Sequence, residues 1–154
     1  MEILIKNIRV IDPHSKTDDV LDILISDSVF SDICKNISRK TSKVIDGTGL
    51  WLIPGLIDMH CHLREPGNEE EETILSGSYS AASGGFTTIC CMANTQPSID
   101  NKVVAGYIFE QSRKALIEVL PYGTVTIGRK GELLSPMGEL AQAGVVGFSD
   151  DGNC

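Results

Sequence analysis

The chain has 154 residues, of which 42% are hydrophobic and 22% are charged, a composition typical of a folded globular chain of about one domain. Its formal net charge is −8 and its Lys and Arg residues form no runs, which argues against partners such as nucleic acid or a membrane surface. No apolar run reaches the roughly 18 residues of a membrane-spanning helix, and the first residues lack the pattern of a secretory signal. The five cysteines are odd in number and lie mostly in expected strands, which favours reduced thiols in a cytoplasmic protein, and the absence of a Cys-x-x-Cys pair argues against a zinc knuckle.

Short runs rich in β-branched residues fill residues 1–52 and predict an all-β segment. Turn-forming residues separate the runs, which are Ile3–Ile5, Ile8–Ile11, Val20–Ile25, Val29–Ile33 and Val44–Asp46. His14 falls in one of the turns, and we interpret it as an exposed loop residue. A sheet of about 50 residues buries little core by itself, so we expect this segment to pack against further protein.

From residue 53 onward, apolar runs that predict buried strands alternate with stretches that predict helices. The strands are expected at Leu56–His62, Phe86–Met92, Glu118–Val125 and Val145–Ser149. Pro121 weakens the third of them, because proline cannot donate a hydrogen bond within a sheet. The alternation predicts a parallel sheet with right-handed crossovers. No Gly-x-Gly-x-x-Gly follows the first strand, which argues against a dinucleotide-binding fold.

The three intervening helices have recognisable starts and ends. Asn68 can cap the first, the run Glu69–Glu72 favours the positive end of its dipole, and the pair Gly84-Gly85 should end it. The second helix is expected from Asp100 to about Leu116. The third should begin with Ser135 as its cap and Pro136 in its first turn, and should end at Gly144.

The segment Pro54–Gly67 carries the clearest functional signal. His60 and His62 lie two residues apart on one expected strand, so their side chains point to the same face while Cys61 points to the other. Two imidazoles placed in this way can hold one metal ion, although an ordinary core or surface histidine is the simpler reading of His-x-His alone. Arg64 follows the strand, where its guanidinium could bind a carboxylate through two hydrogen bonds.

Polar residues also follow two other expected strands, Asn94 after the second and Asp150-Asp151 after the fourth. Gathering at the carboxyl ends of strands is typical of the active-site face of a (β/α)8 barrel. The alternative for the two aspartates is a simple turn, since Asp-Asp-Gly is a common turn sequence. Asn94 could equally form an Asx turn, and Asp58 could either orient a ligand histidine or cap the local backbone.

The segments Pro54–Gly67, Met92–Thr95 and Phe148–Gly152 together resemble the amidohydrolase superfamily and, within it, bacterial class I dihydroorotases. The resemblance runs over residues 1–154. It implies an α/β fold in which residues 53–154 supply the first half of a (β/α)8 TIM barrel, with four strands and three helices, truncated after the fourth strand. Residues 1–52 would supply the N-terminal part of a small β-sandwich.

The resemblance also implies roles for site residues. His60 and His62 would bind the first metal ion, and Asp151 would bridge two zinc ions. Arg64 and Asn94 would hold the substrate carboxylate, while Asp150 would be a turn residue or a support for the ligands. Ala93 departs from the family pattern, which usually has proline before this asparagine, and could loosen the loop that carries Asn94.

The implied activity is that of a zinc-dependent cyclic amide hydrolase, which interconverts N-carbamoyl-L-aspartate and L-dihydroorotate in pyrimidine biosynthesis. The partners would be a small acidic substrate and further copies of the chain in a cytoplasmic homo-oligomer. The family takes two more histidines and an aspartate base from later strands. This chain has three histidines in all, so it cannot complete the second metal site, contains no assigned catalytic base and is expected to be inactive alone.

Two alternatives to this function stay open. One is a related hydrolase of the hydantoinase or allantoinase type, but such enzymes usually place a carboxylated lysine at the bridging position. No lysine lies near Asp151, and Arg64 suits an acidic substrate. The other is a non-catalytic half-barrel that binds a metal ion or a partner chain.

Overall fold

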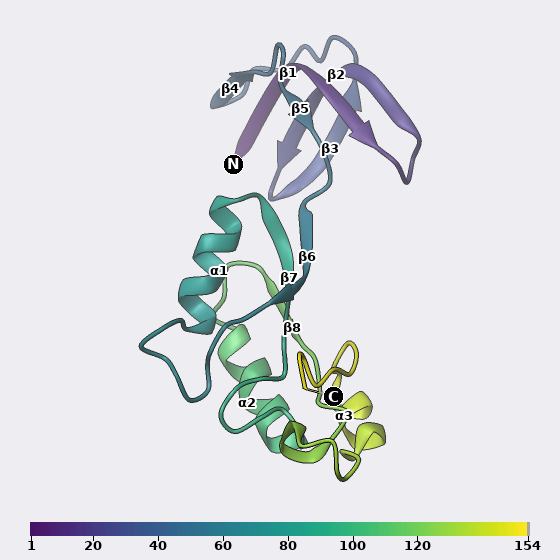
Figure 1. Ribbon diagram of the computed structural model, residues 1–154. Coiled ribbons are helices and arrows are strands. Elements are labelled where there is room, and N and C mark those ends of the chain that lie inside the picture. The colour runs from purple at the N-terminus through teal and green to yellow at the C-terminus, as the bar shows by residue number, and fades with distance from the viewer. Residues whose placement is uncertain (154) are drawn as a thin grey trace. The chain divides into compact units, whose positions relative to one another are not determined.

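The computed structural model describes residues 1–153, which form two compact units, Met1–Pro54 and a second unit that begins at Gly55 (Figure 1). The first unit holds a five-stranded sheet in the order β3-β2-β1-β4, with β5 also paired to β1. Its strands are β1 (Glu2–Asp12), β2 (Thr17–Ser26), β3 (Val29–Cys34), β4 (Lys43–Asp46) and β5 (Trp51–Leu52). The pairs β1–β2 and β2–β3 are antiparallel, whereas β4 and β5 run parallel to β1.

The β runs expected before residue 53 all lie in strands, but the first two belong to a single strand. Between Ile5 and Ile8 the pairing of β1 with β2 shifts register, and Asn7 adopts a φ of 56°. Asparagine tolerates this left-handed conformation, so it forms a bulge inside the strand instead of a turn between two strands. The short strand β5 was not expected. His14 is exposed in the turn between β1 and β2, as predicted.

A buried carboxylate ties the bulge to the rest of this sheet. Asp22 is 3% exposed, accepts hydrogen bonds from the backbone N–H groups of Asn7 and Ile37, both at 2.9 Å, and pairs with the ammonium group of Lys6. Burial alone would raise the pKa of Asp22, but these donors outweigh it and hold the pKa below its ordinary value. The bulge amide is therefore satisfied by a side chain of the neighbouring strand.

The second unit contains the expected alternation of strands and helices. Its parallel sheet has the order β6-β7-β8, formed by β6 (Leu56–Cys61), β7 (Phe86–Cys91) and β8 (Glu118–Pro121). The helices are α1 (Ile74–Ser83), α2 (Lys102–Ser112) and α3 (Met137–Ala143), with a short 3-10 turn η1 (Ile127–Arg129). Among the described residues, no helix combines the length and the apolar character needed to cross a bilayer.

The fourth expected strand, Val145–Ser149, was a wrong prediction. This segment runs beside the end of β8 and forms an isolated parallel bridge just beyond that strand, between Gly123 and Phe148. Val146 donates its N–H to the carbonyl of Pro121 at 3.0 Å. Because proline has no N–H to return, the ladder cannot extend into a regular strand. The segment nevertheless leads directly into Asp150 and Asp151.

Helix α1 starts later than expected. Thr73 caps it instead of Asn68, because Thr73 and Ser76 form a reciprocal capping box in which each side chain accepts a backbone N–H of the other. The run Glu69–Glu72 lies ahead of the helix, and no acidic residue occupies its first turn. The helix ends at Gly84, as the sequence predicts.

The other two helices differ from expectation at their starts. Asn101 caps α2 in place of Asp100, with its side chain accepting the N–H groups of Val103 and Val104, and α2 ends at Ser112, short of Leu116. Ser135 does not cap α3, because its hydroxyl pairs with the buried hydroxyl of Thr124 at 2.6 Å and leaves Pro136 at the cap position. Gly144 ends α3 with a φ of 101°, as predicted.

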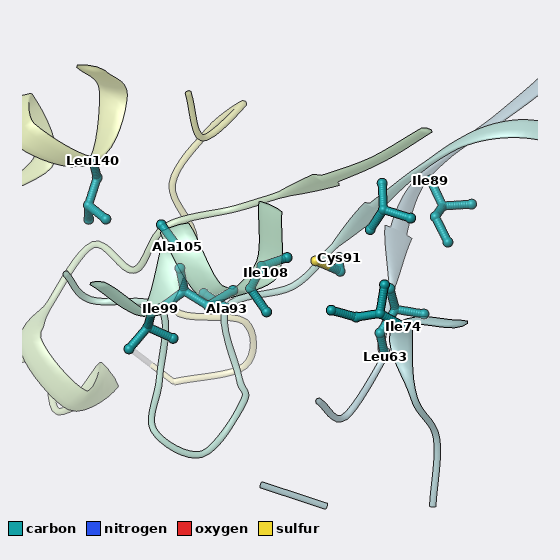
Figure 2. Close-up of a cluster of buried hydrophobic side chains, with 11 residues drawn as sticks. Leu63, Ile74, Ile89, Cys91, Ala93, Ile99, Ala105, Ile108 and Leu140 are labelled. Carbon is teal, nitrogen blue, oxygen red and sulfur yellow. The ribbon is translucent and has the colours of Figure 1, made fainter. Parts of the chain in front are cut away.

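The core of the second unit lies where the sheet meets its helices (Figure 2). It is built from aliphatic side chains of the strands, their following loops and the three helices, together with one cysteine: Leu63, Ile74, Ile89, Cys91, Ala93, Ile99, Val104, Ala105, Ile108, Val119 and Leu140. Burial raises the pKa of Cys61 and of Cys91 to about 12, so both thiols stay protonated at neutral pH. No disulfide forms among the described cysteines, and Cys154 lies outside the described residues.

Candidate metal centre

The centre begins at the carboxyl end of β6, where His60 is the penultimate strand residue and His62 follows the last one. Their rings lie 5.3 Å apart between centroids, at an interplanar angle of 69°. Cys61, between them, packs against the core and directs its Sγ to the carbonyl of Cys90 at 3.4 Å. The two imidazoles therefore share a side and the thiol takes the other, as strand alternation predicts.

Asp151 joins the two histidines from the turn that follows residues 145–149. Its Oδ1 lies 3.2 Å from His60 Nε2, and its Oδ2 lies 3.8 Å from His62 Nδ1. One ligand atom from each of the three side chains can be chosen so that all lie within 4.8 Å of one another. Tetrahedral zinc with bonds of about 2.0–2.1 Å separates its ligand atoms by roughly 3.3 Å. The donor types, two imidazoles and a carboxylate, suit such an ion, and ligand atoms within 4.8 Å of one another need only small side-chain rotations to reach its spacing.

Asn94, in the loop after β7, lies between two of these side chains. Its Nδ2 donates to Asp151 Oδ2 at 2.8 Å, and its Oδ1 lies 3.0 Å from His62 Nδ1. Since the amide oxygen can only accept, this arrangement assigns the proton of His62 to Nδ1. The other ring nitrogen, Nε2, is then left with a lone pair that can bind a metal ion.

Arg64 forms an ion pair with Glu71 in the structure and none with Asp151. It adopts a φ of 57°, and its Nε lies 3.4 Å from Glu71 Oε2, with side chains that are 37% and 60% exposed. An ion pair between partly exposed side chains contributes little free energy, about 0–1 kcal/mol. The guanidinium can therefore exchange Glu71 for another carboxylate at small cost.

Asp58 and Asp150, for which the sequence left alternative roles open, both accept hydrogen bonds from backbone N–H groups. Asp58 accepts the N–H of His60 at 2.9 Å, which is the local capping role. Asp150 accepts the N–H groups of Val125 and Thr126 and the Thr126 hydroxyl, at 2.9, 3.1 and 2.6 Å. Burial opposes ionisation of Asp150, but these hydrogen bonds prevail and lower its pKa. Asp150 thus anchors the turn that presents its neighbour, Asp151.

The sequence did not reveal a buried link beside the centre. Glu65, which is 9% exposed, accepts the N–H of Ile74 at 2.7 Å and the hydroxyl of Tyr107 at 2.8 Å. The hydrogen bond to Glu65, then burial and the charge of Glu65, raise the pKa of Tyr107 to about 12. Glu65 joins the loop after β6 to α1 and α2. Nothing local marks it, because both partners lie on helices further along the chain.

The fold places the chain with hydantoinases and dihydroorotases of known structure. The L-hydantoinase (dihydropyrimidinase) of Arthrobacter aurescens is 25% identical, with a TM-score of 0.73 over 95% of this chain and 32% of its own. A dihydroorotase structure is 14% identical, with a TM-score of 0.64 over 96% of this chain and 41% of its own. This second likeness concerns the fold alone.

Sequence comparison narrows the class to one family. The profile described as dihydro-orotase-like matches residues 49–154. The dihydroorotase of Solibacter usitatus (strain Ellin6076) is 52% identical over 153 residues, and that of Geobacter sp. (strain M21) is 51% identical over 154 residues. Each match covers 99% of this chain and 36% of the relative. The chain belongs to the dihydro-orotase-like family and spans about a third of the length of these relatives.

Proposed function

We propose that this chain carries the first metal-ligand pair, the bridging carboxylate and the substrate-carboxylate contacts of a zinc-dependent dihydroorotase. The reaction is the interconversion of N-carbamoyl-L-aspartate and L-dihydroorotate, a step of pyrimidine biosynthesis in the cytoplasm. The observation that carries the proposal is the convergence of His60, His62 and Asp151 from segments far apart in sequence. Family membership supports it, because dihydroorotases are among the relatives about half identical over the whole chain.

The proposed architecture follows the same family. Residues 1–52 would be the N-terminal part of a small β-sandwich, and residues 53–154 the first part of a (β/α)8 TIM barrel. Parallel pairing of β6, β7 and β8 in chain order supports the barrel assignment, as does the position of the candidate ligands after strand ends.

Each residue has a distinct task in the proposed site. His60, His62 and Asp151 would hold a metal ion, which would lower the pKa of a water molecule and polarise the carbonyl of a cyclic amide. Arg64 exchanges its ion pair with Glu71 for two hydrogen bonds to the substrate carboxylate. Asn94 donates its remaining amide hydrogen to the same carboxylate. The general base is assigned to no residue of this chain.

The test is to measure zinc per chain and hydrolysis of L-dihydroorotate in the same sample of the 154-residue polypeptide. We expect one zinc ion per chain and no hydrolysis, because three protein ligands and a water molecule complete one site and no base accompanies them. A His60→Ala variant should lose the zinc and keep its fold, because the His60 side chain is exposed and lies outside the core. Absence of zinc from the unmodified chain would contradict the metal centre, and two zinc ions with hydrolysis would contradict the inactivity of the chain.

The structural similarity to a hydantoinase supports a second candidate function, the hydrolysis of hydantoin-like rings. The two candidates differ in the charge of their substrates. If Arg64 serves an acidic substrate, the zinc-loaded chain should bind N-carbamoyl-L-aspartate and ignore hydantoin in ligand-observed NMR. Preference for hydantoin would favour the second candidate, and binding of neither would favour a non-catalytic half-barrel.

We also propose that the chain self-associates. Within the described residues β6 pairs on one side only, and it exposes Leu56, Ile57 and Met59 at 42%, 61% and 68%. An apolar edge strand of this kind tends to pair with other chains.

Analytical ultracentrifugation should therefore detect species heavier than the monomer. Ile57→Lys should shift the mass toward the monomer, whereas Val103→Lys, at a 76% exposed position on α2, should not. A sharp cooperative melt of the unmodified chain at monomer mass would refute self-association.

A further inference from the structure

The loop after β8 holds an arginine against the turn that presents Asp151. Arg129, in η1, donates from Nε to the carbonyl of Asp150 at 2.9 Å and from Nη2 to the carbonyl of Asp151 at 2.8 Å. The two donors of one planar guanidinium therefore bind two consecutive carbonyls. A fork of this kind fixes the direction of the backbone as well as its distance, which a single donor cannot do.

Both sides of this contact have an unusual backbone. Arg129 has a φ of 61° and Asp151 a φ of 41°, in the left-handed region that side chains other than glycine seldom occupy. Such conformations persist where surrounding contacts hold them, and they concentrate at functional sites. Here Asn153 donates to the carbonyl of Arg129 at 3.1 Å, and the N–H of Asp151 donates to Ser149 Oγ at 3.0 Å.

The direction of the Asp151 carboxylate depends on this backbone. With its main chain held in the left-handed region, Asp151 places one oxygen at His60 and the other at Asn94. Relaxation of φ toward ordinary values would swing Cβ and the carboxylate away from the histidines. The hydrogen bonds that the Arg129 side chain donates go to carbonyls of the turn and not to the three candidate ligand side chains, so its effect on their geometry passes through the Asp151 backbone.

We propose that Arg129 is a positioning residue that holds the Asp151 carboxylate toward His60 and His62 and thereby raises zinc affinity. The inference rests on the proposed function in one respect, that Asp151 is a zinc ligand. Loss of a group that only orients a metal ligand typically costs 10–100-fold in metal affinity. We expect Arg129→Gln to weaken zinc binding within about that range, and Arg129→Lys to weaken it as well, since lysine offers a point charge without the fork.

The experiment measures the zinc dissociation constant by competition with a chromophoric chelator, and the visible spectrum of the cobalt-substituted chain. The variants are Arg129→Gln, Arg129→Lys and Asp151→Asn, with Arg113→Gln as the control, because Arg113 is 77% exposed and its ion pair among residues 1–153 is with Glu110. We expect weaker zinc binding and a changed cobalt spectrum for both Arg129 variants, at an unchanged thermal melt, and no change for Arg113→Gln. The spectrum matters because it reports the geometry around the metal, which a general loss of stability would not alter.

The outcomes separate the two proposals. If the unmodified chain binds no zinc, or if Asp151→Asn binds it as well as the unmodified chain, the proposed metal centre fails and this inference fails with it. If Asp151→Asn loses zinc while Arg129→Lys keeps both the affinity and the cobalt spectrum of the unmodified chain, Arg129 has no positioning role and the metal centre stands. Should Arg129→Gln fail to fold, Arg129→Lys, which retains the charge and the length, decides by the same two readings.

Discussion

Replacing Asp151 with asparagine should weaken zinc binding by about 100-fold or more, the upper end of what losing a group that merely orients a ligand costs. Asparagine has nearly the same shape as aspartate, and its Oδ1 can still accept the hydrogen bond that Asn94 donates. What the variant removes is the negative charge that faces His60 and that a divalent cation requires. Zinc affinity measured by chelator competition at pH 7 checks this result.

The matched control for that variant is Glu139→Gln on α3. Glu139 is exposed and lies in the same compact unit, so the control changes the net charge of the chain by the same amount without touching the centre. Its zinc affinity should equal that of the unmodified chain. Equal affinities for Asp151→Asn and Glu139→Gln would mean that Asp151 is no ligand and that its contact with His60 is only a hydrogen-bonding arrangement.

The features that the sequence predicted correctly are those set by local patterns. Alternating apolar runs predict strands β6 and β7, and the two-residue spacing of His60 and His62 predicts that they share a face. Parallel strands bring their carboxyl ends to one edge, which is why the sequence places Asn94 near the histidines. Asp151 also reaches them, although the segment before it forms no regular strand. These inferences require only the period of a strand and the direction of a crossover.

The features that the sequence did not predict depend on contacts between distant segments. Thr73 prevails over Asn68 as a cap because Ser76 reciprocates its hydrogen bond and Glu65 takes the N–H of the next residue, Ile74. No sequence motif marks Arg129, and its partners Asp150 and Asp151 lie more than 20 residues further along the chain. Competing caps and long-range hydrogen bonds are decided by packing, which residue spacing alone does not encode.

Replacing Glu65 with alanine should lower the free energy of unfolding by about 2–5 kcal/mol. The substitution leaves two donors without their acceptor: the N–H of Ile74, a residue with 0% exposure, and the hydroxyl of Tyr107. The unsatisfied buried N–H of Ile74 costs about 1–3 kcal/mol, and both hydrogen bonds lost here, including that of the partly exposed Tyr107 hydroxyl, were made to a charged group. Against a total stability of about 5–15 kcal/mol for a typical domain, this is a large fraction. Urea denaturation at fixed protein concentration measures it, and faster hydrogen exchange at the Ile74 amide locates it.

Tyr107→Phe is the partner variant that separates the two lost contacts. It removes only one donor, and because Tyr107 is 38% exposed its hydroxyl also has access to water, so we expect a loss of about 1 kcal/mol and normal exchange at Ile74. The double variant should cost less than the sum of the single ones, since the hydroxyl that Glu65→Ala would strand is then absent. Additive losses, or protected exchange at Ile74 in Glu65→Ala, would contradict the view that this carboxylate links α1 and α2 to the loop after β6.

If the link holds, Glu65→Ala should also weaken zinc binding, because Glu65 follows His62 on the loop after β6 and fixes the position of that loop.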